Sequence, residues 1–274
     1  MINIKNLKLS WYSSYKVNKL REMILSILSI TKITKVIFIF GCQRSGTTII
    51  QNIISLDPSV KYHGEGDEPY FYDVSTEKHH RLKPQQDVDR ILNNELFNYM
   101  AIKPLYESQH ANNLLKQYSN SKSVWMFRHY QDVIDSHLHY YKYNSHDYIK
   151  PFFDKNIKNW LNESIPKDIN EFIQQFKLEE LSDADAYGLF WIVRNSIYWD
   201  IKDNKNVILI NYEKLVSQPD VEISKTCKFL NLPYYSFYCN AIRSNAVSKK
   251  VNFTLQDSIK EKCEDIYNRL IEKS

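Results

Sequence analysis

Three short apolar runs stand out along the chain, and each is followed by a segment with helical spacing. The runs are KVIFIF (35–40), KSVWMFR (122–128) and NVILINY (206–212). Such runs are typical of strands buried on both faces of a parallel sheet. Strands that alternate with helices predict an α/β fold with a doubly wound, mostly parallel sheet and helices on both faces. Ligands are then expected at the carboxyl ends of the strands.

No internal repeat, low-complexity tract or long Pro/Gly-rich linker interrupts the sequence, so we expect a single domain over residues 35–274. Helical stretches such as DADAYGLFWIVRNSIYWDI lie between the expected strands. The less regular region 137–182 is rich in His, Tyr and Asn. It is expected either to line a substrate cleft or to form a helical insertion at the surface.

Residues 1–34 are expected to form a helical extension before the domain. Their segment KVNKLREMILSILSI places basic residues before a short apolar run, which is too short to span a bilayer and lacks a small-residue cleavage site. We expect an amphipathic helix packed on the domain, with peripheral contact to a membrane as the alternative. No transmembrane segment is expected elsewhere.

Composition and charge narrow the function classes. The chain has 36 Lys+Arg and 32 Asp+Glu, a net charge of +4, which does not indicate nucleic-acid binding but allows a local basic pocket for a polyanionic cofactor. The four cysteines show no C-x-x-C pair and no tight His/Cys spacing. A metal site and a disulfide framework are therefore not expected, and a reducing compartment, the cytoplasm, suits these thiols.

The first apolar run leads into GCQRSGTT, a loop that nearly matches the Walker pattern G-x-x-x-x-G-K-[ST]. Gly41, Gly46 and Thr48 fit, but Thr47 stands at the lysine position. Backbone N–H groups of such a loop and of the following helix can hold phosphate, and Arg44 is the only cation within it. Without the lysine, the loop suits a donor with a shorter anionic chain than a triphosphate–magnesium complex.

The sequence QRSGTT resembles the 5′-phosphosulfate loop of the sulfotransferases that use 3′-phosphoadenosine 5′-phosphosulfate (PAPS), with Gln43 in place of the usual proline. The segment VWMFRHYQDVIDS is similar to the family's 3′-phosphate element, in which arginine ends a strand and serine follows eight residues later. Arg128 and Ser136 match these positions, and Tyr130 replaces a proline. An arginine fork and a hydroxyl from one side of a helix suit a dianionic phosphate.

The resemblance extends over residues 36–252 and implies further cofactor contacts. It implies that Ser45, Gly46, Thr47 and Thr48 join Arg44 at the phosphosulfate. Tyr212 in the Y-E-x-L turn is expected near the adenine or ribose, or in the core. The segment AIRSNAVSKKVN is similar to one that closes over the cofactor, which implies contacts from Ser244 and Lys250. Lys103, before Pro104, is either a catalytic cation or a surface lysine.

The general base is expected in DPSVKYHGEGDEPYFYD (57–73), where family members commonly place a glutamate. We favour Glu65 because its separation from Arg44 fits the tyrosylprotein type, and Glu68 resembles the glutamate of heparan-type enzymes. His63 is the third candidate, since some cytosolic members use a histidine. Burial beside aromatic residues would raise the pKa of a carboxyl base toward neutrality.

The resemblance implies in-line transfer of a sulfuryl group from PAPS to a hydroxyl or amine, without a metal. Two alternatives stay open: a P-loop nucleotide kinase or NTPase, which Thr47 disfavours, and a catalytically inactive homologue that binds PAPS. Glycan, lipid, peptide and small-molecule acceptors all occur with the same cofactor elements, so the acceptor stays open. Nucleic acid is not an expected partner.

Overall fold

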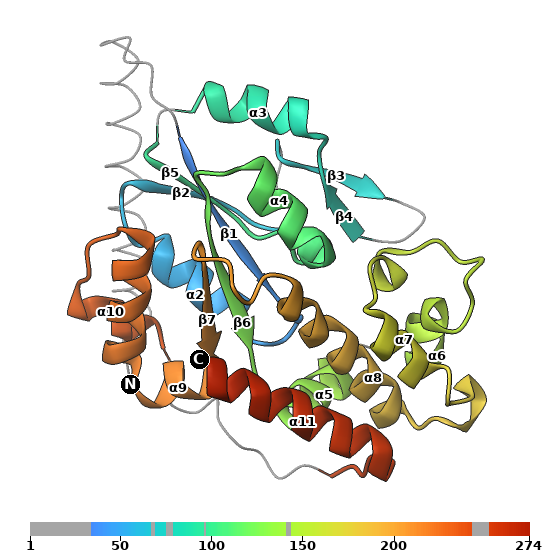
Figure 1. The fold of residues 1–274 in the computed structure, drawn as a ribbon. Coiled ribbons are helices and arrows are strands. Elements are labelled where there is room, and N and C mark those ends of the chain that lie inside the picture. Colours follow the sequence, from blue (N-terminus) through green and yellow to red (C-terminus); the bar gives the residue numbers. More distant parts are fainter. Residues whose placement is uncertain (1–33, 67–68, 75–78, 96, 141–143, 243–251) are drawn as a thin grey trace, which may run out of the picture.

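A parallel sheet organises the computed structural model, which describes residues 34–66, 69–74, 79–95, 97–140, 144–242 and 252–274 (Figure 1). Within these residues the sheet has 5 strands in the order β2-β5-β1-β6-β7, and each neighbouring pair is parallel. The strands are β1 (Lys35–Gly41), β2 (Val60–His63), β5 (Tyr99–Ile102), β6 (Lys122–Phe127) and β7 (Val207–Asn211). The expected mostly parallel α/β sheet is confirmed.

Strand β1 lies at the centre of the sheet. Its Ile37 pairs with Ala101 of β5 on one side and with Lys122 of β6 on the other. The chain passes from β1 to β2 and β5 on one side, then crosses to β6 and β7 on the other. The strand order therefore reverses at β1, and the carboxyl end of this strand is where such sheets bind ligands.

The three strands predicted from apolar runs are confirmed to within one residue at each end. Strands β2 and β5 were not predicted, because each has only four residues, VKYH and YMAI, and period-based reading needs longer runs. Their place in the sheet depends on pairing with β1 and with each other rather than on a local pattern.

Helices cover both faces of the sheet, as the sequence predicted. Phe38 and Phe40 of β1 point into a core shared with α8, whereas Ile37 and Ile39 point into a second core shared with α2 and α10. The α-helices are α2 (Thr47–Ile54), α3 (Gln85–Asn93), α4 (Ala111–Gln117), α5 (Tyr130–Tyr140), α6 (Ser145–Ile149), α7 (Lys167–Ile173), α8 (Asp183–Ser196), α9 (Tyr212–Ser217), α10 (Pro219–Leu230) and α11 (Asp257–Lys273). The 3-10 helices are η1 (Leu105–His110), η2 (Lys150–Phe152), η3 (Trp160–Asn162), η4 (Leu178–Glu180), η5 (Ile197–Asp200) and η6 (Ser236–Ala241).

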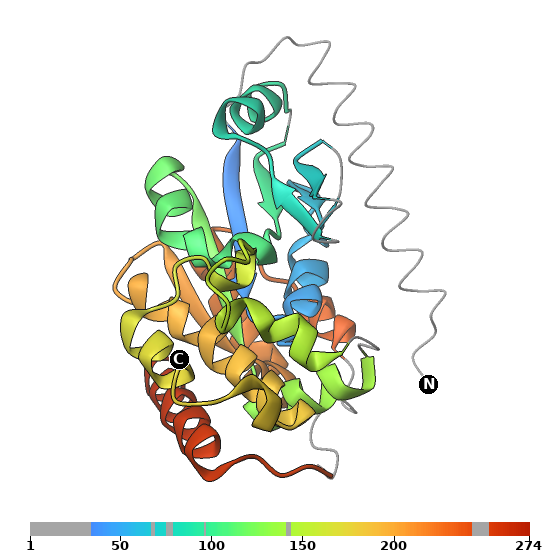
Figure 2. The same cartoon turned by 90° about the vertical axis from the view of Figure 1, so that its right-hand side faces the viewer.

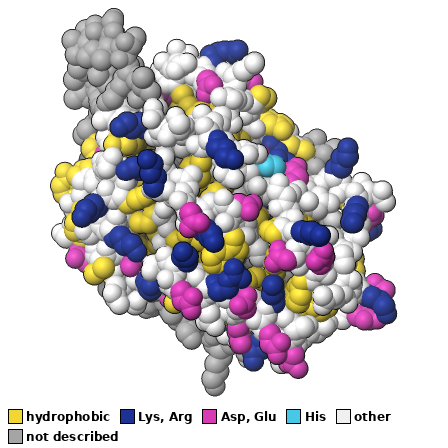
Figure 3. All heavy atoms as spheres, viewed as in Figure 1, with side chains coloured by type: hydrophobic (Ala, Val, Ile, Leu, Met, Phe, Trp, Pro, Cys, Tyr) yellow, Lys and Arg dark blue, Asp and Glu magenta, His cyan; other side chains and the backbone are white. Residues whose placement is uncertain are grey.

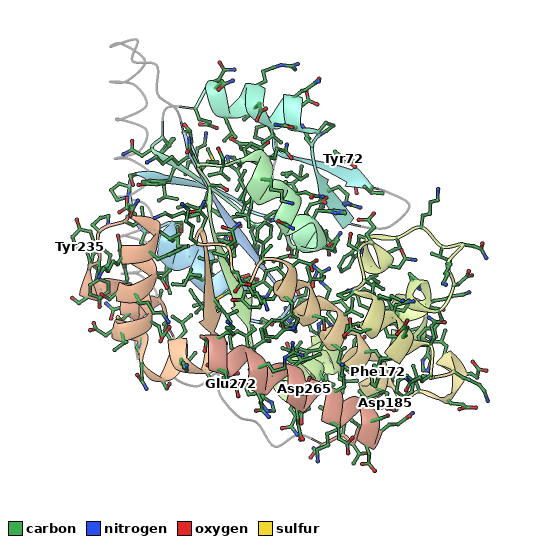
Figure 4. All side chains as sticks on the ribbon, viewed as in Figure 1. Tyr72, Phe172, Asp185, Tyr235, Asp265 and Glu272 are labelled. Atoms are coloured by element: carbon green, nitrogen blue, oxygen red, sulfur yellow. The ribbon has the colours of Figure 1, made fainter. Side chains whose placement is uncertain are left out.

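Helix α8 is buried along its length except at Asp183. It begins at a capping box, in which the Ser182 hydroxyl accepts from the N–H of Asp185 and the Asp185 carboxylate accepts from the N–H of Ser182. Asp185 also accepts from the N–H of Gln256 at 2.8 Å, just before α11. Figures 1 and 2 show α8 and α11 side by side, and Figure 4 shows Asp185 near the start of α11. The cap therefore fixes both helices at one end.

An antiparallel hairpin, β3 (Phe71–Val74) and β4 (His79–Leu82), lies outside the main sheet. Its Arg81 donates to Glu107 of η1 and to Glu163, both at 3.0 Å from Nη2, which ties the hairpin to the domain. In the described part of the chain, no helix has the length and apolarity needed to cross a bilayer. The expected extension lies outside that part except for Thr34, whose hydroxyl donates to the Phe97 carbonyl at 2.8 Å.

Candidate active site

The loop between β1 and α2 owes its shape to left-handed backbone at Gly41 (φ 139°), Arg44 (φ 68°) and Gly46 (φ 86°). A Cβ on Gly41, the last residue of β1, would lie 2.3 Å from the carbonyl oxygen of Met126, so this strand end approaches β6 more closely than any side chain permits. The N–H of Ser45 closes the turn by donating to the Cys42 carbonyl at 3.2 Å. The loop therefore sits directly at the end of the central strands.

The first turn of α2 follows the predicted phosphate loop and has no side-chain cap. Its N-cap, Gly46, offers no side chain to the free N–H groups, and the turn contains no acidic residue. The dipole and open N–H groups of such a turn favour an anion. Thr47 is buried and Thr48 is exposed. The amide of Gln43 is buried and, among the described residues, has no hydrogen-bond partner, so the loop leaves a polar group available to a ligand.

Cys42 and Ser45 line the inner side of the loop. Both side chains are fully buried. Burial raises the pKa of the Cys42 thiol to about 12, partly offset by the Arg194 guanidinium and hydrogen bonds with Ser45 and Asn195. The thiol therefore stays protonated at neutral pH and is a packing residue rather than a nucleophile.

The structure brings together two residues that lie far apart in sequence. Arg44 Nε donates to Ser136 Oγ of α5 at 2.9 Å, and the Arg44 guanidinium lies 4.0 Å from the ring centroid of Tyr140. The cation of the predicted phosphosulfate loop thus contacts the serine of the predicted 3′-phosphate element. Their roles in cofactor binding stay predictions.

Arg128 follows β6 and lies next to Tyr212 and Asp132. Its guanidinium is 4.4 Å from the Tyr212 ring centroid, and its Nη2 donates to Asp132 at 3.0 Å. A Cβ on Gly46 would lie 2.4 Å from the same Tyr212 ring. Tyr212 therefore stands between the phosphate loop and Arg128, which links the two predicted halves of the cofactor site.

Lys103 comes from the end of β5, beside the phosphate loop. Its Nζ donates to Thr48 Oγ1 at 3.2 Å, and its N–H donates to the His63 carbonyl at 3.3 Å. The side chain of Lys103 is buried, so the surface-lysine alternative raised by the sequence does not describe it. Lys103 thus connects the carboxyl ends of β2 and β5 with the first turn of α2.

Glu65 lies just after β2, close to Lys103. Burial raises the pKa of the Glu65 carboxyl to about 7, against the opposing effects of Lys103, of a hydrogen bond from the backbone N–H of Leu105 and of Arg194. Its Oε1 is buried and has no hydrogen-bond partner among the described residues. A carboxyl whose pKa lies near neutrality is suited to act as a general base.

His63, the third candidate base, is the last residue of β2. It pairs with Ile102 of β5, and its ring centroid lies 4.8 Å from that of Tyr70. It is therefore held by aromatic packing at the same strand ends as Lys103. Glu68, Ser244 and Lys250 lie outside the described residues. Over the described part of the chain, no group of three or more His, Cys, Asp or Glu side chains is arranged to hold a metal ion.

Two residues near the site were not singled out by the sequence analysis. Arg194 is buried in α8 and donates to the Leu105 carbonyl at 2.7 Å. His137 is buried in α5, where burial lowers its pKa to about 3, assisted by the Arg44 charge and opposed by a hydrogen bond with the Gln43 backbone. Arg194 could have been found from the sequence, because an arginine is unusual within the apolar run GLFWIVRNS. Nothing in the local pattern distinguished His137.

Comparison with known proteins places these features in a family. The family profile described as sulfotransferase domain matches residues 34–270. No curated protein sequence matches the chain. The solved sulfotransferase domain from the curacin biosynthetic pathway superposes with a TM-score of 0.53 at 14% identity, covering 86% of this chain and 99% of that one.

Two further structures are similar at lower scores. The sulfotransferase domain from the Synechococcus PCC 7002 olefin synthase has a TM-score of 0.49 at 12% identity, covering 87% of this chain and 96% of that one. Mouse sulfotransferase SULT7A1, complexed with PAP, has a TM-score of 0.48 at 14% identity, covering 90% and 88%. At such identities the likeness concerns the fold.

Proposed function

This chain belongs to the sulfotransferase domain family, and we propose that it uses PAPS to transfer a sulfuryl group to a hydroxyl or amine. One observation carries the proposal: the Lys103 charge acts on the Glu65 carboxyl, and Lys103 donates to Thr48 in the first turn of α2, at the carboxyl ends of neighbouring strands. A carboxyl group, a cation and an anion cradle are the parts that in-line transfer to a hydroxyl needs.

The phosphate loop fits the 5′ end of the donor. The left-handed backbone at Gly46 and the uncapped first turn of α2 form an anion cradle, and the buried Gln43 amide lacks a protein partner among the described residues. We assign the phosphosulfate to this cradle, with Arg44, Ser45, Gly46, Thr47 and Thr48. The bound donor supplies the activated sulfuryl group. Arg44 and Lys103 bring positive charge to this loop, so we propose a reaction without a metal ion.

The 3′-phosphate is assigned to Arg128 and Ser136. Support comes from the Arg44–Ser136 hydrogen bond and from Tyr212, which packs between Gly46 and Arg128. A planar guanidinium suits a dianionic phosphate, and the buried Tyr212 ring gives an apolar wall beside it. Ser244 and Lys250 are proposed to complete the cofactor contacts.

In the proposed reaction Glu65 accepts the proton of the acceptor hydroxyl or amine. The acceptor atom then forms a bond to sulfur while the bond from sulfur to the donor phosphate oxygen breaks. Lys103, at hydrogen-bond distance from Thr48, stabilises the negative charge that develops on the leaving phosphate. The neighbouring positive charge also keeps a share of Glu65 ionised at neutral pH. Glu68 and His63 are the alternative bases.

The proposed partner is an acceptor that carries a hydroxyl or amine, on a glycan, lipid, peptide or small molecule, and not a nucleic acid. On the face shown in Figure 3, Asp and Glu side chains lie among the Lys and Arg side chains, unlike the basic stripe of a nucleic-acid-binding surface. Cys42, Cys227, Cys239 and Cys263 are free thiols. We therefore propose a reducing compartment, the cytoplasm.

A binding comparison tests the proposal. We expect 3′-phosphoadenosine 5′-phosphate to raise the melting temperature of the protein, and ATP with Mg²⁺ to leave it unchanged, because the loop lacks the Walker lysine. Radiolabelled PAPS then identifies the acceptor by transfer of label. Stabilisation by ATP with Mg²⁺ alone would instead favour a nucleotide kinase or NTPase, and binding of PAPS without transfer to any acceptor would favour an inactive homologue.

A further inference from the structure

Arg194 is a buried cation that the proposed reaction leaves without a role. Its residue is 1% exposed, and its guanidinium lies 4.9 Å from the ring centroid of Trp160. Within the part of the chain that the structure describes, its hydrogen bonds go to neutral acceptors: Nη1 donates to Gln109 Oε1 at 3.0 Å, and Nη2 donates to the Leu105 carbonyl at 2.7 Å. Burying a charge is costly unless it is compensated, and among carboxylates Glu107 of η1 offsets part of this cost. Because its hydrogen bonds nevertheless go to neutral groups, this guanidinium calls for a functional explanation.

The acceptors of Arg194 belong to η1, the segment that follows Lys103. Leu105 is the first residue of η1, and its N–H donates to the Glu65 carboxyl. Two residues earlier, Lys103 Nζ donates to Thr48 at 3.2 Å. Arg194 Nη2 therefore binds the carbonyl of Leu105, and the N–H of the same Leu105 binds Glu65, the predicted base. Because Arg is planar and its donors are fixed, holding Leu105 and Gln109 together orients the whole turn.

The electrostatic surroundings of Glu65 include Arg194. Among the described residues, the positive groups that act on Glu65 are Lys103, from the end of β5, and Arg194, from α8. The ring of His80, from β4, lies against the neighbouring Gly66. In buried surroundings, the charges of Lys103 and Arg194 oppose the preference for a neutral carboxyl.

We propose that Arg194 is a positioning residue for the transfer reaction: through Leu105 it fixes the turn that presents Lys103 and the backbone donor to Glu65, and it supplies a buried positive charge to that carboxyl. The inference rests on the proposed function, in which Glu65 is the base and Lys103 the cation. Its two parts, charge and geometry, are separable because lysine retains the charge but lacks the rigid planar arrangement of donors with which arginine holds two separate acceptors.

The charge is tested without any catalytic assay. A ¹³C NMR titration of the Glu65 carboxyl, with the signal assigned from its loss in E65Q, gives its pKa in each variant. We expect R194M to raise this pKa by about one unit, because an opposite charge is removed from a buried carboxyl. R194K should shift it by less than half as much. An unchanged pKa in folded R194M would overturn the electrostatic part.

The geometry is tested by turnover. We expect R194K to lower kcat by about tenfold or more, because small misplacements of reacting groups are costly, while KM for PAPS changes little. The acidic limb of the pH–rate profile should stay near that of the wild type in R194K and move to higher pH in R194M. Full activity of R194K would overturn the positioning role.

Two controls separate the outcomes. S182A removes the N-cap of the same helix without touching Leu105, so it should destabilise α8 and leave the Glu65 pKa unchanged; a shift like that of R194M would reduce the effect to general loosening and overturn the proposal. If R194M does not fold, the chemical shift of the Leu105 amide proton is followed in R194K as Glu65 titrates. A smaller change in this shift than in the wild type supports the proposal, and an unchanged response overturns it. A protein that binds no PAP but shows the NMR shifts would refute the proposed function alone.

Discussion

Burial raises the pKa of acidic side chains around this site and lowers the pKa of a basic one. It raises the pKa of the Glu65 carboxyl to about 7 and that of the Cys42 thiol to about 12, and it lowers the pKa of His137 to about 3. In each case the environment disfavours the charged form. At neutral pH this leaves the thiol and the imidazole neutral, and Glu65 is the one of the three that titrates near pH 7.

We expect Glu65→Gln to reduce turnover by about 10²-fold or more, because the proton acceptor is lost. It should also stabilise the fold at pH 8. The native carboxyl binds protons more tightly than the unfolded one, so its burial cost appears as pH rises above 4.5 and is complete above about 7. The gain in unfolding free energy should be about 1–3 kcal/mol, measured by urea denaturation at pH 5 and pH 8.

Glu163→Gln is the matched control with the opposite sign. Hydrogen bonding with His110 and then with Arg81 and Gln109 lowers the pKa of Glu163 to about 2, against the effect of burial. This carboxylate contributes stability above pH 4.5 that is lost as pH falls toward 2, so its removal should destabilise the protein at pH 8. Equal effects of both substitutions at pH 8 would contradict the environment assigned to Glu65.

Arg128 is expected to contribute directly to cofactor affinity. Arg128→Ala should weaken binding of 3′-phosphoadenosine 5′-phosphate by about 1.5–3 kcal/mol, the range for a charge-assisted hydrogen bond. Isothermal titration calorimetry measures this. Arg90→Ala removes an exposed arginine that also pairs with an aspartate, Asp87, and should leave the affinity unchanged. Equal affinity of Arg128→Ala and the wild type would refute the assigned 3′-phosphate contact.

Among the elements, the β1–α2 unit combines a sequence-encoded loop with contacts from elsewhere in the chain. Its buried strand and helix have the apolar pattern of a parallel βα unit, and its glycines permit the left-handed turn. The ring of Tyr212, at the start of α9, then packs against Gly46 and closes the loop from outside. The loop is therefore shaped both by its own backbone and by β7 and α9.

Gly46→Ala should destabilise the loop for two reasons: φ is 86°, and the added Cβ would lie 2.4 Å from the Tyr212 ring. We expect a loss of about 1–3 kcal/mol in unfolding free energy and weaker cofactor binding, measured by thermal denaturation with and without 3′-phosphoadenosine 5′-phosphate. Asn231→Gly, at another left-handed position (φ 61°) that caps α10, is the control and should not destabilise. A Gly46→Ala protein as stable as the wild type would contradict this packing.

At the scale of the whole molecule, two cores join the sheet to helices from the entire described chain. The core that contains Phe38 and Phe40 extends through α8 to α11, so residues near the C-terminus stabilise the strand that carries the phosphate loop. His137 belongs to this region: its ring stacks on Tyr187 at 4.9 Å, and Phe190 lies 5.0 Å away. Charging it would place a cation among aromatic rings.

The fold should therefore lose stability in mild acid through His137. The imidazole pKa is 6.5 when unfolded and about 3 when folded, so its contribution is present above pH 6.5 and is lost progressively as pH falls toward 3. His137→Gln removes the titration. It should be less stable than the wild type at pH 7, with a difference that shrinks toward pH 4, as measured by urea unfolding. A pH-independent difference would contradict neutral burial of His137.

Local patterns predicted the parts of this protein that are local in origin. The three longer strands, the helix after each and the phosphate loop follow from apolar runs, glycine positions and helical spacing. Strands β2 and β5 were not predicted, because a strand of four residues shows too little alternation of apolar and polar positions. The role of Arg194 was not predicted, because the sequence around this arginine does not indicate its contact with Leu105.

The sequence by itself determined the α/β class, the family resemblance and the candidate residues, since motif spacing and strand patterns are short-range properties. Only the tertiary structure decided which residues meet at the site. Arg44 reaches Ser136 across 92 positions, Lys103 reaches Thr48 across 55, and Arg194 reaches Leu105 across 89. These contacts depend on the strand order and on burial of the two cores, which are set by the free energy of packing the whole chain rather than by any one segment.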